Sequence, residues 1–171
     1  MSSEKQIGTV GTGQRRRVRR SGFSMIELVI VVVIIGIIAA IALPRMSRGA
    51  AAAGDSALAQ NLAILRNAVD LYQTEHGSTF PAAAEISDQL TTYTADDGTG
   101  KTAAKTATNI YGPYLRKIPP VTVGARKGQT GIGTADGATI GWIYDATAGT
   151  VTANVPDATL KDGAGKLYSA Y

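Results

Sequence analysis

The chain contains no cysteine and only one histidine among its 171 residues. Without cysteine it forms no disulfide, and it has no thiol that acts as a nucleophile or a metal ligand. If it is exported, its stability must therefore come from side-chain packing or from a bound ion. His76 follows a long helical pattern, so we expect it to lie in solvent at a helix end. The aspartates show no spacing typical of paired acid–base chemistry. The sequence thus predicts a protein that is not an enzyme.

Positive charge is concentrated at the start of the chain. The formal net charge is +4, from 17 Lys and Arg against 13 Asp and Glu. Residues 1–22 hold six of the basic residues and one acid, which leaves 11 basic and 12 acidic residues and a net charge of −1 for the remainder. A basic run can bind nucleic acid, but its position directly before an apolar segment favours a topological role that keeps this end in the cytoplasm. We expect no nucleic-acid partner. The arginines of the run are Arg15, Arg16, Arg17, Arg19 and Arg20.

The longest apolar stretch comprises residues 23–43 and is interrupted only by Ser24 and Glu27. Its 21 residues span roughly 31 Å as a helix, which is the thickness of the hydrocarbon core of a bilayer. A carboxylate at the centre of such a helix costs about 2.5–3.5 kcal/mol, so Glu27 requires an explanation. The simplest one is a tolerated glutamate near the end of an ordinary membrane helix.

A more specific explanation comes from a family resemblance. The arginine-rich leader, Gly22, Phe23, Glu27 and Pro44 together resemble the class III signal of type IV pilins and type II secretion pseudopilins. The resemblance implies that a prepilin peptidase cuts between Gly22 and Phe23 and methylates the new amino terminus on Phe23. It also implies that Glu27 pairs, within a filament, with the terminal amine of a neighbouring subunit. The absence of cysteine favours pseudopilins or disulfide-free pilins.

Two other processing routes are open. Ala40-Ile41-Ala42 has the form of an ordinary signal-peptidase site, which would release a soluble protein from Leu43. The apolar segment is longer than the usual 7–15 residues of such signals, which argues against this route. An uncleaved anchor that carries a soluble domain is the other alternative.

Beyond the apolar stretch the helical pattern continues and becomes amphipathic. Pro44 removes a backbone donor, so we expect the helix to kink or unwind near residues 40–44, as a bend in the isolated chain and a partial unwinding in a filament. The next apolar residues recur at spacings of four and three, which predicts one buried helix face that ends before Gly77. These residues are Leu58, Leu62, Leu65, Val69 and Tyr72.

The rest of the chain predicts a small domain with little helix. We expect a second short helix within residues 78–94, a surface loop over 94–109, an exposed glycine-rich loop over 121–137, and a hairpin formed by strands at 139–144 and 150–155. Gly100-Lys101-Thr102 matches only the tail of a phosphate-binding loop, because Ala95 stands where the first glycine is required. The fold class predicted is α+β and pilin-like, with a long N-terminal helix packed on a small antiparallel sheet. The four predicted parts are a cleaved leader (1–22), a transmembrane and filament-core helix (23–43), its amphipathic half (44–77) and a globular domain (78–171).

The resemblance also raises the question of calcium, which major pseudopilins often bind near the C-terminus. Asp157 and Asp162 are the candidate ligands, but no complete calcium-loop pattern surrounds them. Ordinary structural acids in a loop are the alternative. We expect no other cofactor.

The expected function is that of a structural subunit that polymerises into a type IV pilus-like filament, most specifically as a major pseudopilin of a type II secretion system. The segments Gly112-Pro113-Tyr114-Leu115 and 141–145 resemble major pseudopilins and favour this choice. The alternatives are a type IV pilus pilin, for adhesion, motility or DNA uptake, and a membrane-anchored or secreted ligand-binding domain. The partners implied are other copies, the prepilin peptidase, an inner-membrane assembly platform with its ATPase, minor pilins or pseudopilins, and membrane lipid before assembly. The implied location is the bacterial inner membrane, crossed once with the N-terminus in the cytoplasm, and then a periplasmic or extracellular filament.

Overall fold

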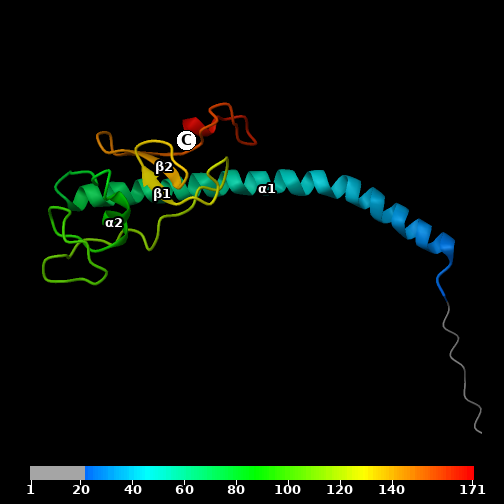
Figure 1. The fold of residues 1–171 in the computed structure, drawn as a ribbon, viewed down its shortest axis with the longest axis horizontal. Coiled ribbons are helices and arrows are strands. Elements are labelled where there is room, and N and C mark those ends of the chain that lie inside the picture. The colour runs from blue at the N-terminus through cyan, green and yellow to red at the C-terminus, as the bar shows by residue number, and fades with distance from the viewer. Residues whose placement is uncertain (1–21) are drawn as a thin grey trace, which may run out of the picture. The chain divides into compact units, whose positions relative to one another are not determined.

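The computed structural model describes residues 22–171, which form two compact units that divide between Ile41 and Ala42. Within the second unit, β1 and β2 lie beside the C-terminal half of α1 (Figure 1). This arrangement confirms the α+β class, with a long N-terminal helix packed on a small sheet. The elements in order are α1 (Met25–Glu75), α2 (Ile86–Thr91), β1 (Gly131–Gly133), β2 (Ile140–Asp145), β3 (Thr150–Ala153) and the 3-10 helix η1 (Tyr168–Ala170).

Helix α1 is continuous through Pro44. The sequence predicted a bend near residues 40–44 in the isolated chain, which stays a prediction, and the α-helical assignment has no break in this stretch. Proline removes one helical hydrogen bond, whereas the leucine, methionine and alanine residues around it are strong helix formers that keep their own bonds. The partial unwinding expected in a filament stays a prediction, as do the boundaries of the four predicted parts.

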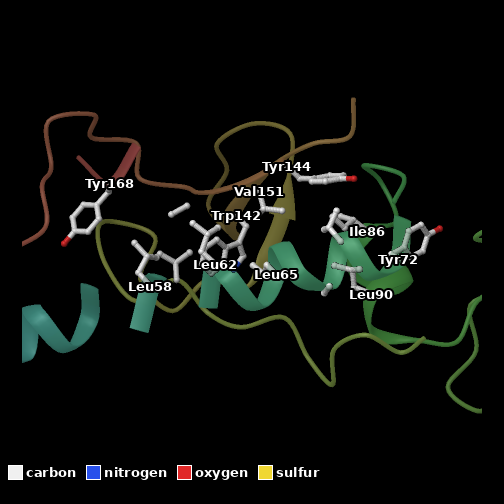
Figure 2. Close-up of a cluster of buried hydrophobic side chains, with 14 residues drawn as sticks. Leu58, Leu62, Leu65, Tyr72, Ile86, Leu90, Trp142, Tyr144, Val151 and Tyr168 are labelled. Atoms are coloured by element: carbon white, nitrogen blue, oxygen red, sulfur yellow. The ribbon is translucent and has the colours of Figure 1, made fainter. Parts of the chain in front are cut away.

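The core of the second unit is built on one face of α1. The five residues predicted from the helical spacing are all buried, with at most 2% of each exposed, so this prediction is confirmed. Side chains from α2 and from the sheet pack against them (Figure 2). These buried residues include Ile86 and Leu90 from α2 and Trp142, Tyr144 and Val151 from the sheet, and Val121 from the segment before β1 joins them.

The sheet contains the predicted hairpin and one further strand. In the antiparallel β2–β3 pair, Trp142 lies opposite Ala153 and Tyr144 lies opposite Val151. Strand β1 pairs with β2 in parallel, so the sheet is mixed and the prediction of an antiparallel sheet is wrong for this edge. Residues 121–137 were expected to be an exposed loop, because glycine has a low strand propensity. At Gly131, however, a Cβ atom would lie 2.4 Å from the carbonyl oxygen of Thr139, so the missing side chain is what allows the two segments to approach.

The segment between α1 and the sheet contains the predicted second short helix. This helix is Ile86–Thr91, within the predicted range 78–94. Residues 94–109 form the predicted loop, and two isolated bridges close it, Tyr93 with Thr102 and Thr94 with Tyr111. Within the next segment, the backbone amides of Tyr114 and Leu115 both donate to the carbonyl of Leu90, which fastens that segment to α2.

Candidate functional site

The N-terminal end of the described chain presents an exposed, non-helical segment. Gly22, Phe23 and Ser24 precede α1, and 80% of Phe23 is exposed. The peptide bond between Gly22 and Phe23 therefore lies outside the hydrogen-bonded helix, where a protease can reach the backbone. Cleavage at this bond stays a prediction. The five arginines of the leader lie outside the described residues.

Glu27 lies in the first turn of α1, close to the predicted new amino terminus. Its Oε2 atom accepts a long hydrogen bond of 3.4 Å from the backbone N–H of Ser24, the residue that directly follows Phe23. The carbonyl of Ser24 accepts from the amides of Glu27 and Leu28 at 3.1 Å each, which starts the helix. A carboxylate at this position interacts favourably with the partial positive charge of the helix N-terminus. It is also placed where a terminal amine would lie after cleavage.

No other part of the described chain covers the first part of α1. Between Phe23 and Leu43 the large apolar side chains are 45–86% exposed. Among the described residues, α1 is the one helix long and apolar enough to cross a membrane, and none of its most apolar window is buried. Such a surface is stable only in contact with lipid or with other apolar protein surfaces.

His76 is buried, with 4% of its surface exposed, so the expectation of a solvated histidine is wrong. Its ring stacks on Tyr72 at 3.8 Å, and the positive φ angles of Gly77 and Ser78 turn the following chain back over the helix end. Nδ1 lies 2.9 Å from the carbonyl oxygen of Tyr72, and Nε2 lies 3.0 Å from the hydroxyl of Thr94. Because a carbonyl only accepts, Nδ1 donates, and in the neutral ring Nε2 accepts from Thr94. The histidine thus joins α1 to the loop that begins at Thr94.

Tyr114, which is partly buried, and Tyr144, which is fully buried, are also bound in ways that indicate a structural role. Tyr114 donates to Glu75 at 2.6 Å, and burial together with this carboxylate raises the pKa of Tyr114. Tyr144 donates to the carbonyl of Pro81 at 2.9 Å, and burial raises the pKa of Tyr144 to about 12. These phenols stay protonated at neutral pH and connect elements of the fold.

The two calcium candidates are held by separate sets of hydrogen bonds. Asp157 Oδ1 accepts from the backbone N–H and the hydroxyl of Thr159, at 2.9 and 2.6 Å. Asp162 Oδ1 accepts from the amides of Ala164 and Lys166, at 2.9 and 2.8 Å, and its Oδ2 accepts from the Tyr171 hydroxyl at 2.5 Å. Within residues 22–171 no group of three or more acidic or histidine side chains is arranged to hold a metal ion. Calcium binding stays untested.

Sequence reasoning missed the role of Asp55. Its Oδ1 atom accepts from the hydroxyl of Tyr168, and its Oδ2 atom accepts from the amide of Gly163 at 2.9 Å. These contacts attach the C-terminal segment to α1. The one signal in the sequence is an aspartate within an alanine-rich helical stretch, and it does not identify the partner.

Part of the chain is similar to a known protein family. A family model for a prokaryotic N-terminal methylation motif matches residues 17–43. This range contains Gly22, Phe23, Glu27 and the whole apolar stretch. The comparisons with curated proteins and with solved structures returned no match. The motif supports a type IV pilin-like protein and does not separate pilins from pseudopilins.

Proposed function

We propose that the chain is a structural subunit whose copies polymerise through the first part of α1. In this proposal Glu27 sets the position of each copy relative to its neighbour. The observation that carries this proposal is an uncovered apolar helix with a single carboxylate in its first turn, next to an exposed Gly22–Phe23 bond. The methylation motif over residues 17–43 supports the same conclusion, because it indicates a structural subunit that is processed by a prepilin peptidase.

The apolar helix explains why assembly is favourable. In the inner membrane, lipid covers the side chains of residues 23–43. When a subunit leaves the bilayer, helix–helix contacts in the filament must replace nearly all of these lipid contacts, because water would oppose the exposure of so much apolar surface. The platform and ATPase of such an assembly system supply the work of extraction.

The pairing of Glu27 explains how the register between neighbouring subunits is fixed. An unpaired carboxylate in an apolar environment is costly, and pairing with the methylated amine of Phe23 on a neighbouring copy removes that cost. N-methylation retains the positive charge of the amine. The contact between Glu27 and the Ser24 amide supports this assignment, because it places the carboxylate beside the chain end that cleavage would create.

The finer assignment is a major pseudopilin of a type II secretion system. It is supported by the Gly112–Leu115 segment, which is similar to major pseudopilins and is fastened to α2. Deletion of the gene is then expected to stop secretion of exported proteins without loss of surface pili. Loss of long surface fibres with secretion intact would favour a type IV pilus pilin.

Processing is tested by the intact mass of the protein isolated from membranes. We expect a chain that begins at a methylated Phe23. A chain that keeps its arginines would indicate an anchored domain, and one that begins at Leu43 would indicate a secreted domain. Either result would contradict the proposal.

The role of Glu27 is tested by a matched pair of substitutions. Glu27→Gln keeps the size of the side chain and removes its charge, and we expect fibre growth to be lost while membrane insertion persists. Glu27→Asp keeps the charge, and we expect part of the fibre growth to remain. Normal fibres from the Glu27→Gln variant would contradict the assignment.

A further inference from the structure

We propose that the C-terminal segment, residues 157–171, is held in place by two hydrogen bonds between carboxylates and tyrosines, one within the segment and one to α1, and needs no metal ion. We call this set of contacts the C-terminal clasp, and it consists of Asp55, Asp162, Tyr168 and Tyr171. Calcium is the ligand that the resemblance to major pseudopilins suggests for this end of the chain. The side chains present here have a different chemistry.

Three hydrogen-bond donors already occupy the carboxylate of Asp162. Calcium takes about six to eight oxygen ligands at roughly 2.3–2.6 Å, so it must approach a carboxylate along its lone pairs. In Asp162 three of the roughly four lone-pair directions are taken, by two backbone N–H groups on Oδ1 and by the Tyr171 hydroxyl on Oδ2. Each donor points a positive hydrogen at the position a cation would occupy. Calcium would have to displace these three contacts before it could bind.

The other carboxylates do not complete a site. Asp157 is bound to Thr159 within its own turn. Asp55 accepts from Tyr168 and Gly163, so both of its oxygens are also engaged. A positive charge is already present, because the ammonium group of Lys166 lies 3.8 Å from the centre of the Tyr171 ring. That ring belongs to the tyrosine that bonds Asp162.

The clasp also closes one end of the core. Tyr168 is 8% exposed and belongs to the same buried cluster as Leu58 (Figure 2). Its ring packs in this cluster while its hydroxyl reaches Asp55 on α1. The backbone amide of Tyr168 donates to the carbonyl of Leu160 at 3.1 Å, which ties the two halves of the C-terminal segment together. The clasp therefore performs the task that a bound ion would perform, which is to hold an irregular segment against the helix.

The test compares the effect of removing calcium with the effect of removing a tyrosine hydroxyl. It uses the full chain in detergent micelles. Hydrogen exchange of residues 157–171 is measured by mass spectrometry in EDTA and in millimolar calcium chloride, and we expect the same exchange in both. Tyr168→Phe keeps the ring and removes the hydroxyl, and we expect exchange of this segment to accelerate about tenfold. The matched control is Tyr93→Phe, because the hydroxyl of Tyr93 makes no hydrogen bond within the part of the chain that the structure describes. The control is expected to leave the segment unchanged.

A second variant covers the case in which Tyr168→Phe does not fold. Tyr171→Phe removes the hydroxyl that bonds Asp162, at a position outside the fully buried core, and it is expected to accelerate exchange in the same segment. Fluorescence of Trp142, the single tryptophan and a fully buried one, reports whether each variant is folded. Slower exchange or a higher melting temperature with calcium would overturn the proposal, and so would a Tyr171→Phe variant that exchanges like the control. All of these measurements use unassembled protein, so their outcome does not depend on fibre growth.

Discussion

Asp55 accepts a hydrogen bond from the hydroxyl of Tyr168, a residue 113 positions further along the chain. The same carboxylate accepts from the amide of Gly163. One side chain in α1 therefore fixes two points of the C-terminal segment, and its removal tests how much that segment contributes to stability.

We expect Asp55→Ala to lower the free energy of unfolding by about 2 kcal/mol, because two hydrogen bonds to a charged group are lost and the Tyr168 hydroxyl is left without its acceptor. Thermal unfolding of the full chain, followed by Trp142 fluorescence, measures this change. Asp70→Ala is the control, since the Asp70 carboxylate on the same helix makes no hydrogen bond or ion pair within the described residues. Equal losses for the two variants would show that the contacts of Asp55 carry no stability.

The ion pair between Arg126 and Asp136 predicts a dependence of stability on pH. Two hydrogen bonds from the guanidinium, at 2.9 and 2.8 Å, together with one from Asn154, lower the pKa of Asp136 to about 2. The folded-state pKa is below the unfolded value of about 3.9, so the stabilisation is complete above pH 4 and is lost as the pH falls toward 2. We expect Asp136→Asn to be less stable than the natural protein at pH 6, and we expect this difference to shrink as the pH falls and to disappear only below the folded-state pKa of about 2. A difference that does not shrink as the pH falls would contradict this assignment.

Truncation of two adjacent residues of α1 is expected to have very different costs in stability. Leu65 is fully buried, and Leu65→Ala should cost about 3 kcal/mol because it leaves a cavity among packed side chains. Ile64 is 47% exposed, and Ile64→Ala should cost less than about 1 kcal/mol. Denaturant unfolding in micelles measures both values. Similar costs would mean that the core face of the helix is assigned wrongly.

His76 and Thr94 are expected to behave as a coupled pair. His76→Phe keeps a ring against Tyr72 but leaves the hydroxyl of Thr94, which is fully buried, without its partner, at a cost of about 1–3 kcal/mol. The double variant with Thr94→Val removes both polar groups and should recover part of this loss. A double-mutant cycle from unfolding data measures the coupling. Strictly additive effects would show that the two side chains do not interact.

Features with a regular spacing were predictable from the sequence. The alternation of four and three residues from Leu58 to Tyr72 identified the buried face of α1, because each of these positions lies on one side of a helix. The residues on either side of the turn at 145–149 identified the β2–β3 hairpin. At the N-terminal end, the residue pattern around Gly22 and Glu27 was specific enough to be matched independently by a family model.

Features that depend on distant contacts were not predictable. Two of the three residues of β1 are glycines, whose lack of a side chain lets the backbone of β1 approach its neighbouring segment closely. Strand propensities do not describe this effect. His76 was expected in solvent because only the fold brings Thr94 and Tyr111 to the end of α1. Asp55 and Tyr168 carry no pattern that connects them across the whole second unit.

The buried cluster of the second unit contains no residue before Leu58. If the proposed filament forms, residues 23–41 would exchange lipid for neighbouring subunits while the buried cluster keeps its packing, because none of its side chains comes from that stretch. In the filament proposed, the domain that follows the apolar stretch is already folded while the subunit is still in the membrane. Fibre growth therefore adds subunits whose domain is folded. Shortening of the fibre would return subunits to the membrane with this domain still folded, so the same subunits could be assembled again.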